Sequence, residues 1–431
     1  MLRHDAQQPT TGPPTRQAKP FHGKIGTMQE PPAPVEVRFS SLVYGGWALG
    51  RLADGRALFA PYLLPGERAL VRLTESRTGY ARGRPVELLE GSPLRVVPRC
   101  RHFGECGGCH YQHLHYDAQL EAKQQVLREQ LARLAGLEDP PLLDPLPSPV
   151  PWNYRNHLRF HRAAGGGPGF RSFRSSQVVP ITECHLPEPA LAARWPQLPP
   201  SPAGKRWVLR SGTDGPPAAW QPEEASRPEA SRQVPPVRFD LPCGSFRVSP
   251  DSFFQVNTPM AARLAEEVLL QVEGGLQDAA KGAVILDLYC GVGLFTRALA
   301  PHVGSVTGVE LSPAAGADFR HNLRGLDNAR LVRGDVREVL PRLSVRPDAA
   351  VADPPRAGLG PAVIRALAAL APGLLAYVSC DPATLARDAR QLAQEGYALR
   401  RIRLLDLFPQ TYHLETLSIW SRTGRSAILV P

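Results

Sequence analysis

The stretch AVILDLYCGVGLFTRALAPHVGSVTGVEL, residues 283–311, decides the fold of this chain. An apolar β-type run ends in a turn that contains Gly291 and Gly293, a helical stretch follows, and a second β-type run ends at Glu310. Glycines at such a turn let the backbone approach a ligand closely, and an acid about 20 residues further on can bind ribose hydroxyls. The stretch therefore predicts a strand–helix–strand unit with a ligand at the carboxyl ends of its strands.

The same alternation continues toward the end of the chain. Helical stretches such as 294–301 and 361–371 separate the first five β-type runs, which is the signature of a doubly wound, mostly parallel sheet. The last two runs follow each other after a short connection, so we expect them to pair as an antiparallel hairpin at the sheet edge. The expected strands are 283–289, 305–311, 329–334, 348–353, 374–379, 398–405 and 416–421.

Acidic residues accompany four of these consecutive strands. Asp287, Glu310, Asp335 and Asp353 stand at or near carboxyl ends, which converge on the ligand crevice of an open sheet. NAD is disfavoured because the first turn lacks the full Gly-x-Gly-x-x-Gly of a pyrophosphate binder. A cofactor without phosphate, such as S-adenosylmethionine (SAM), tolerates an acidic rim better. The alternative is that these acids are helix caps and turn residues.

A thiol and a carboxylate are expected at the same edge. The fifth strand ends in VSCDPATLARD, which places Cys380 beside the crevice, and DLFPQTYHLETLSIW places Glu415 nearby. Methylation of uracil at C5 needs such a pair, because a thiolate must add to C6 and a base must later remove the C5 proton. Taken separately, Cys380 reads as a buried structural thiol and Glu415 as a surface acid. Taken with the acidic rim, the two residues indicate catalysis.

The amino-terminal part has a different pattern. Residues 1–33 are polar and proline-rich, which predicts a disordered tail. Short β-type runs separated by glycine-containing turns follow from about residue 35, and they predict a small barrel. Tyr44 and Trp47 beside the first of these turns either offer a stacking surface for bases or belong to the barrel core.

Residues 152–174 predict a β-hairpin around a glycine loop. Arginines alternate there with aromatic residues, and the segment contains no acid. This alternation suits a nucleic-acid strand, and the alternative is a hairpin with one solvated face and one core face. The residues are Arg155, Arg159, Arg162, Arg171 and Arg174, with Trp152, Tyr154, Phe160, Phe170 and Phe173.

Two segments flank this hairpin. A helix is expected from Asp117, as its N-cap, to Gly136, because leucines recur along it with helical spacing. Residues 196–236 contain many prolines and little periodicity, so they predict a loop or a loosely structured insertion.

Four cysteines form a candidate metal site: Cys100, Cys106, Cys109 and Cys184. Four thiolates can hold zinc or an iron–sulfur cluster, and the spacing C-x5-C-x2-C does not decide between them. It differs from the C-x3-C-x2-C of radical-SAM enzymes, so radical chemistry is disfavoured. Cys243 and Cys290 are better read as structural.

Composition limits the class of protein. Hydrophobic residues make up 43% of the chain and charged residues 21%, as in a globular protein. No apolar run approaches the roughly 18 residues of a membrane span, and no signal-peptide core is visible, so we expect a cytoplasmic protein with no membrane partner. The net charge of +10 fits a polyanionic partner, and all but five of the 50 basic residues are arginines, which suit phosphate.

The motifs DLYCGVGLFT, ADPPRAGL, VSCDPATLARD and FPQTYHLE resemble the RNA (uracil-5-)-methyltransferase family, as does SFRVSPDSFFQVN. The leading barrel resembles the RNA-binding TRAM module of the ribosomal-RNA members. The resemblance covers about residues 35–431. Residues 196–236 have no match, and Gln410 stands where the family often has histidine.

This resemblance implies an α/β fold with three domains. They are an OB-like TRAM barrel at 34–91, a small α+β central domain at 92–244, and a doubly wound, Rossmann-like SAM-methyltransferase domain at 245–431. It also implies that Cys380 is the nucleophile, that Glu415 is the base, and that the four cysteines of the candidate metal site hold a 4Fe-4S cluster. The SAM contacts that it implies are Gln255, Tyr289, Glu310 and Asp353. We add Gly291, Gly293 and Asp335 because they stand at or just after the ends of strands.

The implied reaction is SAM-dependent methylation of uracil C5 in ribosomal RNA, of the 23S type. The same reaction on transfer RNA is one alternative, which the barrel and the cysteines disfavour because transfer-RNA members usually lack both. A non-catalytic RNA-binding iron–sulfur protein is the other, and the presence of Cys380 and Glu415 disfavours it. We expect a monomer with no obligate protein partner.

Overall fold

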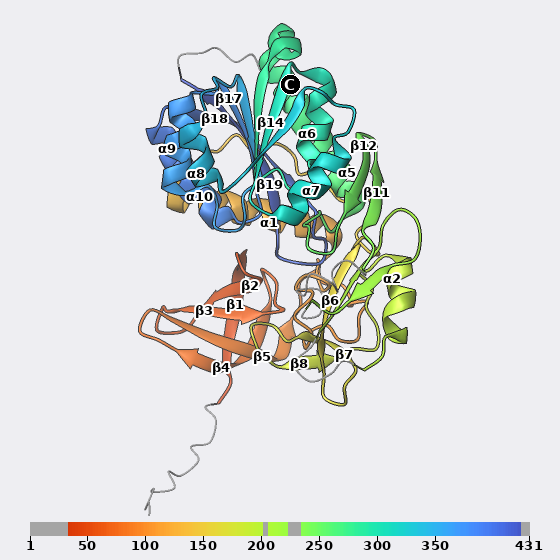
Figure 1. Cartoon of the computed structure of the whole chain (residues 1–431). Coiled ribbons are helices and arrows are strands. Elements are labelled where there is room, and N and C mark those ends of the chain that lie inside the picture. The colour runs from red at the N-terminus through yellow and green to blue at the C-terminus, as the bar shows by residue number, and fades with distance from the viewer. Residues whose placement is uncertain (1–32, 201–205, 223–233, 424–431) are drawn as a thin grey trace, which may run out of the picture.

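The computed structural model describes residues 33–200, 206–222 and 234–423, and Figure 1 shows the whole chain. The predicted tail lies almost wholly outside the described residues. A large sheet with helices on both faces lies above a small barrel and a second, smaller sheet (Figure 1). Among the described residues, no helix is long and apolar enough to cross a membrane.

The large sheet has seven strands in the order β15-β14-β13-β16-β17-β19-β18. Within this sheet, the five strands that come first in the sequence, β13 to β17, are parallel, and β18 and β19 form an antiparallel hairpin. Both predictions are confirmed. Strand β19 lies inside the sheet, between β17 and β18, and is antiparallel to both. The bounds are β13 (Val284–Leu288), β14 (Ser305–Glu310), β15 (Ala329–Arg333), β16 (Ala349–Ala352), β17 (Leu374–Ser379), β18 (Tyr397–Leu405) and β19 (Glu415–Arg422).

Helices cover both faces of this sheet (Figure 1). Every residue of β16 and β17 is buried, as expected for central parallel strands that are covered on both sides. The helices of one face are α5 (Thr258–Leu276), α6 (Leu294–Leu299) and α7 (Pro313–Asn322), and those of the other are α8 (Val336–Val339), α9 (Gly360–Leu370) and α10 (Pro382–Gln394). A hairpin of β11 (Val237–Leu241) and β12 (Gly244–Val248) packs into the same core through Phe239 and Phe246.

The barrel is closed and has five strands in the order β1-β2-β3-β5-β4. Its core is apolar, and it continues into the next segment of the chain, because Tyr111, Leu114 and Ala118 are buried in the same cluster. The barrel is therefore built partly on residues outside its own strands. Those strands are β1 (Val35–Val43), β2 (Trp47–Arg51), β3 (Ala57–Pro61), β4 (Arg68–Ser76) and β5 (Tyr80–Glu90).

A second sheet of five strands, in the order β10-β9-β6-β7-β8, follows the cysteine-rich segment. The predicted hairpin is present as β6 (His157–Arg162) and β7 (Pro168–Arg171), followed by β8 (Val178–Pro180). The prediction of a loop over 196–236 is wrong for β9 (Arg206–Arg210) and β10 (Ala218–Trp220). These strands are too short to show periodicity, and they are held by pairing: β9 pairs with β6, and β10 pairs with β9. A short helix, α2 (Pro189–Arg194), packs on this sheet through Leu191.

The predicted helix after the cysteines is α1 (Tyr116–Gln130), which continues as a wider turn to Ala135 and ends at Gly136. Asp117 lies inside the first turn and is not the N-cap as predicted, although an acid in the first turn still favours the helix. Residues Leu142 and Leu146 then pair with β18, so that α1 is held against the edge of the large sheet.

Candidate functional site

A cavity of about 850 Å³ lies where the large sheet meets the cysteine-rich segment and the smaller sheet. Three groups of predicted site residues reach it from different parts of the chain. Cys380 and Glu415 come from the end of β17 and the start of β19, and Gln255, Glu310 and the four cysteines line the same cavity. One cavity therefore joins groups that the sequence separates by up to 315 residues.

The sheet topology places Cys380 next to Glu415. Cys380 follows β17 and Glu415 begins β19, and the two strands are antiparallel with Ser379 opposite Thr416. The end of one strand therefore lies beside the start of the other. Glu415 is 2% exposed, and its Oε1 atom has no hydrogen-bond partner. A buried, unpartnered carboxyl oxygen costs stability, which is typical of a functional group.

The environment of the cavity disfavours the charged forms of both Cys380 and Glu415. Burial, together with the negative charges of Glu415 and Asp353, raises the pKa of the Cys380 thiol to about 12, against the opposing effect of Arg356. Burial and Asp353 also raise the pKa of Glu415 well above its usual range. His413 cannot replace Glu415 easily, because burial and Arg356 lower its pKa to about 3.

Five of the predicted cofactor residues line the cavity: Gln255, Tyr289, Gly291, Glu310 and Asp353. Gln255 Nε2 lies 3.4 Å from Asp353 Oδ2, and burial with the charge of Asp287 raises the pKa of Asp353 to about 7. Glu310 accepts hydrogen bonds from the backbone N–H of Gly291 at 3.0 Å and of Ser312 at 2.6 Å. Its carboxylate therefore stands at the glycine turn, where the sequence predicted a ribose acceptor.

Tyr289 begins this turn with a φ of 61°, an uncommon conformation for a residue with a side chain. Such strain is retained where a site needs it. Tyr289 and Glu310 also line a neighbouring pocket of about 550 Å³, and Asp335 lies in that second pocket. A ligand that contacts both Gln255 and Asp335 must extend across both spaces, because Gln255 lines only the first of these two pockets and Asp335 only the second.

Three predicted residues have mainly structural contacts. Asp287 is fully buried and accepts hydrogen bonds from the backbone N–H and the hydroxyl of Thr296, in the first turn of α6. Asp335 caps α8 and pairs with Arg337 at 2.7 Å. A Cβ atom on Gly293 would lie 2.5 Å from Leu323, so this glycine serves close packing. Asp287 does not line the cavity, so the expectation of four convergent acids is wrong on this point.

The four cysteines of the candidate metal site are free thiols that line one wall of the cavity. Burial raises the pKa of the Cys109 thiol, and charge on the other three would raise it further. Gly107 between Cys106 and Cys109 has no room for a side chain, because a Cβ atom would lie 2.8 Å from the carbonyl oxygen of Arg171. Among the described residues, no three His, Cys, Asp or Glu side chains are grouped as a single metal ion requires.

The hairpin within residues 152–174 has one solvated face and one core face, which was the alternative to a nucleic-acid surface. Tyr154 and Phe160 are each 1% exposed, and Phe160 stacks on Phe170 at 4.9 Å, so these rings are unavailable to bases. Arg159 points outward from β6 and lines the cavity. Near it, burial and the charges of Arg171, Arg206 and Arg159 lower the pKa of His161. The lining of the cavity therefore contains arginines as well as carboxylates.

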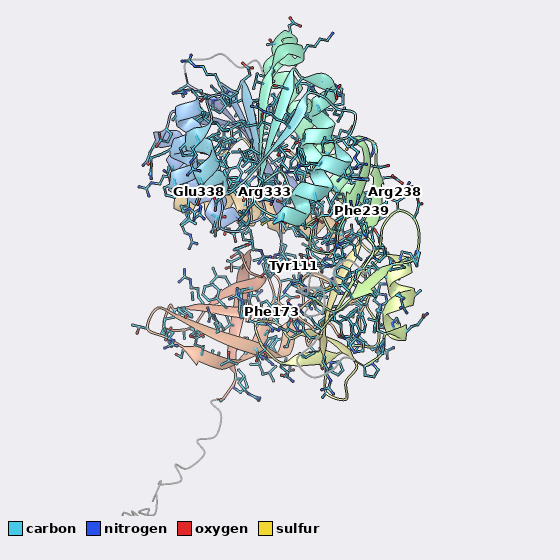
Figure 2. All side chains as sticks on the ribbon, viewed as in Figure 1. Tyr111, Phe173, Arg238, Phe239, Arg333 and Glu338 are labelled. Carbon is cyan, nitrogen blue, oxygen red and sulfur yellow. The ribbon has the colours of Figure 1, made fainter. Side chains whose placement is uncertain are left out.

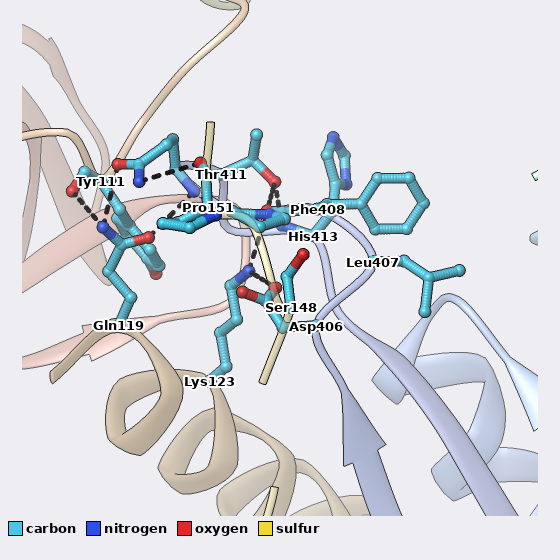
Figure 3. Close-up of polar contacts among 12 residues, drawn as sticks. Tyr111, Gln119, Lys123, Ser148, Pro151, Asp406, Leu407, Phe408, Thr411 and His413 are labelled. Carbon is cyan, nitrogen blue, oxygen red and sulfur yellow. Dashed lines mark hydrogen bonds and ion pairs between the residues drawn. The ribbon is translucent and has the colours of Figure 1, made fainter. Parts of the chain in front are cut away.

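A buried network holds the loop 406–414, which precedes Glu415 (Figure 3). Lys123 Nζ from α1 donates to Asp406 Oδ1 at 2.6 Å and to the carbonyl oxygen of Phe408 at 3.0 Å. The lysine is 1% exposed and the aspartate is fully buried. Sequence reasoning missed this pair, although Lys123 stands on the same helical face as Leu120 and Leu127, which is an unusual place for a lone charge.

Gln410 anchors the middle of this loop. Its backbone N–H donates to Gln119 Oε1 at 2.9 Å, and its side-chain oxygen accepts from Gln119 Nε2 at 3.0 Å. Its carbonyl oxygen accepts from the backbone N–H of His110 and Tyr111. Gln410 has a φ of 69°, a conformation that these contacts hold in place. Figure 2 labels Tyr111 in the region where the barrel and the large sheet meet.

Comparisons with known proteins show similarity to RNA methyltransferases. The family model described as tRNA (Uracil-5-)-methyltransferase matches residues 244–423, and the TRAM domain model matches residues 34–86. An RNA methyltransferase of Streptomyces avermitilis is 35% identical, over 89% of this chain and 97% of its own. The 23S rRNA (uracil(1939)-C(5))-methyltransferase RlmD of Alkalilimnicola ehrlichii is 32% identical, over 92% of this chain and 98% of its own.

A solved structure also matches nearly the whole chain. The tRNA (uracil-54, C5)-methyltransferase of Pyrococcus abyssi, in complex with S-adenosyl-L-homocysteine, has a TM-score of 0.67 and 26% sequence identity. The match covers 90% of this chain and all of the Pyrococcus chain, a share too large to leave out the whole barrel. That relative acts on transfer RNA, whereas the RlmD relative acts on 23S rRNA. From its family models, its relatives and its fold, the chain belongs to the RNA (uracil-5-)-methyltransferase family.

Proposed function

We propose that this protein transfers the methyl group of SAM to C5 of a uridine in ribosomal RNA of the 23S type, with Cys380 as nucleophile and Glu415 as base. The observation that carries the proposal is the pairing of β17 with β19, which sets the thiol beside the carboxyl group in one cavity. The two side chains serve opposite ends of one reaction, since the thiol must act before methyl transfer and the base after it.

In the first half of the reaction, Cys380 loses its proton and its Sγ atom bonds to C6 of the uracil. The electron pair of the C5–C6 double bond moves toward the C4 carbonyl, which makes C5 nucleophilic. C5 then takes the methyl group, and the sulfur–methyl bond of SAM breaks. Arg356 assists the first step, because its positive charge opposes the rise in the pKa of Cys380 and so favours the thiolate.

In the second half, Glu415 removes the C5 proton. The released electron pair restores the C5–C6 double bond, the Cys380–C6 bond breaks, and the thiolate takes up a proton again. A carboxyl group with a raised pKa is a stronger base once it is ionised, which suits removal of a proton from carbon. His413 is too weak a base for this step because of its low pKa.

The methyl donor would lie along the carboxyl ends of β13, β14 and β16. We assign its contacts to Gln255, Tyr289, Gly291, Glu310 and Asp353, with Asp335 at the far end of the neighbouring pocket. Glu310 would accept from ribose hydroxyls, and Asp353 would face the positive end of the donor. Gly293 acts indirectly, by allowing α6 to approach α7 closely.

The choice of RNA rests on a relative that acts on 23S rRNA and aligns with this chain over nearly its full length. The Pyrococcus structure favours a second candidate, the same reaction on transfer RNA. Incubation with unmodified 23S rRNA and unmodified transfer RNA, each with methyl-labelled SAM, separates the two. Labelled 5-methyluridine in transfer RNA alone would overturn the ribosomal assignment.

We further propose that Cys100, Cys106, Cys109 and Cys184 bind a 4Fe-4S cluster. Four free thiols on one cavity wall fit it in their chemistry, because soft thiolate ligands select iron–sulfur clusters. When bound, the cluster would crosslink the cysteine segment to the loop after β8 and so stabilise the wall that faces the RNA. Arg155 would offset part of the thiolate charge, since its charge already lowers the pKa of Cys184 against the larger effect of burial.

Removal of one proposed ligand should destabilise the protein and release the metal. Anaerobically purified parent protein should be brown and contain iron and acid-labile sulfide, whereas Cys184→Ser should lose the colour and unfold at a lower temperature, because metal binding is coupled to folding. Cys243→Ser is the matched control, since this thiol lies outside the cavity. Stoichiometric zinc without sulfide in the parent would refute the cluster.

Arg159 should contribute to RNA affinity through phosphate. Arg159→Gln should lower the slope of log K against log salt by about 0.7, the value for one phosphate contact on a single strand. Arg365→Gln is the control, because this exposed arginine lies on α9 and does not line the cavity. Salt titrations of RNA binding by fluorescence anisotropy measure both slopes. Equal slopes for Arg159→Gln and the parent would assign Arg159 to structure.

A further inference from the structure

Tyr44 leaves the barrel at the turn between β1 and β2 and reaches the large sheet. Its hydroxyl donates a hydrogen bond to Asp381 Oδ2 at 2.9 Å, across 337 positions of the sequence. Asp381 directly follows the nucleophile Cys380. Its other carboxylate oxygen accepts the backbone N–H groups of Ala383 and Thr384, so Asp381 also caps α10. One carboxylate therefore links the barrel to the turn that carries the thiol.

The ring of Tyr44 lies against the segment that carries the base. It packs in an apolar cluster with Val126, Leu404 and Leu414, and Leu414 directly precedes Glu415. The ring also contacts Tyr412 edge-on, with the ring centres 5.8 Å apart. A single side chain of the barrel thus touches the neighbours of both reacting groups, while neither end of it lines the cavity.

The same turn contacts the basic hairpin on its other side. Trp47 lies 5.1 Å from Phe173, and the guanidinium groups of Arg82 and Arg174 lie over the Trp47 ring at 5.7 and 5.2 Å. Gly45 is confined by Arg174, because a Cβ atom there would lie 2.7 Å from its guanidinium. Residues 44–47 therefore join a cationic surface suited to RNA with the two catalytic strand ends.

These contacts overturn the idea that Tyr44 is a stacking platform for bases. Its hydroxyl and ring are both engaged inside the protein, and burial together with the charge of Asp381 raises its pKa, so the hydroxyl remains a donor. A platform needs an open ring face. Tyr44 instead lies between the end of β17 and the start of β19, where it can set the distance between them.

We propose that Tyr44 is a positioning residue through which the TRAM barrel holds the Cys380 turn and the Glu415 segment in their reactive arrangement. This inference rests on the proposed function, since it takes Cys380 and Glu415 as the reacting groups. The barrel then has two tasks: it binds RNA, and it completes the geometry of a site to which it contributes no cavity-lining side chain among the described residues.

The test is the rate of covalent adduct formation in a single turnover. Full-length 23S rRNA transcribed with 5-fluorouridine is the probe, because fluorine at C5 cannot leave as a proton does and the Cys380–C6 bond then persists. Tyr44→Phe keeps the ring and removes only the hydroxyl. It should slow adduct formation about tenfold, because a small misplacement of a nucleophile is costly. The Kd values for RNA and for SAM should stay within about twofold of the parent.

Two further variants test whether Tyr44 acts on adduct formation through its hydrogen bond to Asp381. Asp381→Ser keeps a good helix cap but is too short to reach Tyr44, so it should slow adduct formation to a similar extent, and adding Tyr44→Phe to it should cause little further loss. Tyr80→Phe is the matched control, because its hydroxyl donates to Glu75 within the barrel, at 3.3 Å, and its rate should equal that of the parent.

The outcomes separate this inference from the proposed function. If the parent forms no adduct with 5-fluorouridine RNA of either the ribosomal or the transfer class, the proposed function fails and the inference falls with it. If the parent reacts and Tyr44→Phe reacts equally fast, or loses only RNA affinity, the inference alone is wrong. Additive losses in the double variant would also overturn it, because the two residues would then act independently.

Discussion

Glu415→Gln enzyme should accumulate a methylated protein–RNA adduct instead of product. Neither attack at C6 nor methyl transfer to C5 uses the base, so both steps should proceed, and the reaction should stop where the C5 proton has to leave. The structure strengthens this expectation. Glu415 is, after burial, the largest cause of the raised pKa of Cys380, so a neutral amide should ease thiolate formation. Turnover should fall by about 10²–10⁴-fold, the usual contribution of a general base.

Denaturing electrophoresis with methyl-labelled SAM measures this result, since the adduct carries both the protein and the label. Glu338→Gln is the control, because Glu338 is exposed on α8 and lies outside the cavity (Figure 2). The arrest should be nearly complete, since the low pKa of His413 makes it a poor substitute. Turnover at the parent rate without adduct would show that Glu415 is not the base.

Cys380→Ala should abolish both adduct and product while RNA and SAM still bind. Loss of a catalytic nucleophile costs about 10⁴-fold or more, because no other group of the site makes C5 nucleophilic. Cys380 is only partly buried and forms no disulfide, so the variant should fold. Cys243→Ala, which removes a thiol outside the cavity, should retain full activity. Residual methylation of RNA by Cys380→Ala at a tenth of the parent rate would refute covalent catalysis through this thiol.

The same thiol predicts a pH dependence. A folded-state pKa of about 12 leaves Cys380 protonated at neutral pH, and the thiolate fraction rises about tenfold per pH unit below that value. The rate of adduct formation should therefore rise between pH 6 and pH 9 in the parent. It should rise from a higher starting value in Glu415→Gln, where one of the charges that raise the pKa is absent. A flat profile would mean that proton loss from the thiol does not limit attack.

Much of the carboxyl-terminal domain was predictable from sequence, because its strands are buried on both faces and read as continuous apolar runs. The alternation of these runs with helical stretches predicted that β13 to β17 run parallel to one another. Motifs at strand ends also indicated which side chains meet, since the carboxyl ends of parallel strands share one edge. The barrel followed from its short runs and turns. The small sheet around β9 and β10 did not, because three- and five-residue strands carry no periodicity of their own.

Other features of the site depend on contacts between distant segments. The sequence by itself determined that Cys380 ends a strand and that Glu415 stands near another, but only the antiparallel insertion of β19 beside β17 sets them side by side. The sequence did not separate the acids that line the cavity, Glu310 and Asp353, from Asp287 and Asp335, which accept backbone N–H groups at the starts of α6 and α8. The place of Tyr44 was decided by tertiary structure alone. A local pattern records which face of a strand is buried, whereas a hydrogen bond across 337 residues exists only after two domains have packed.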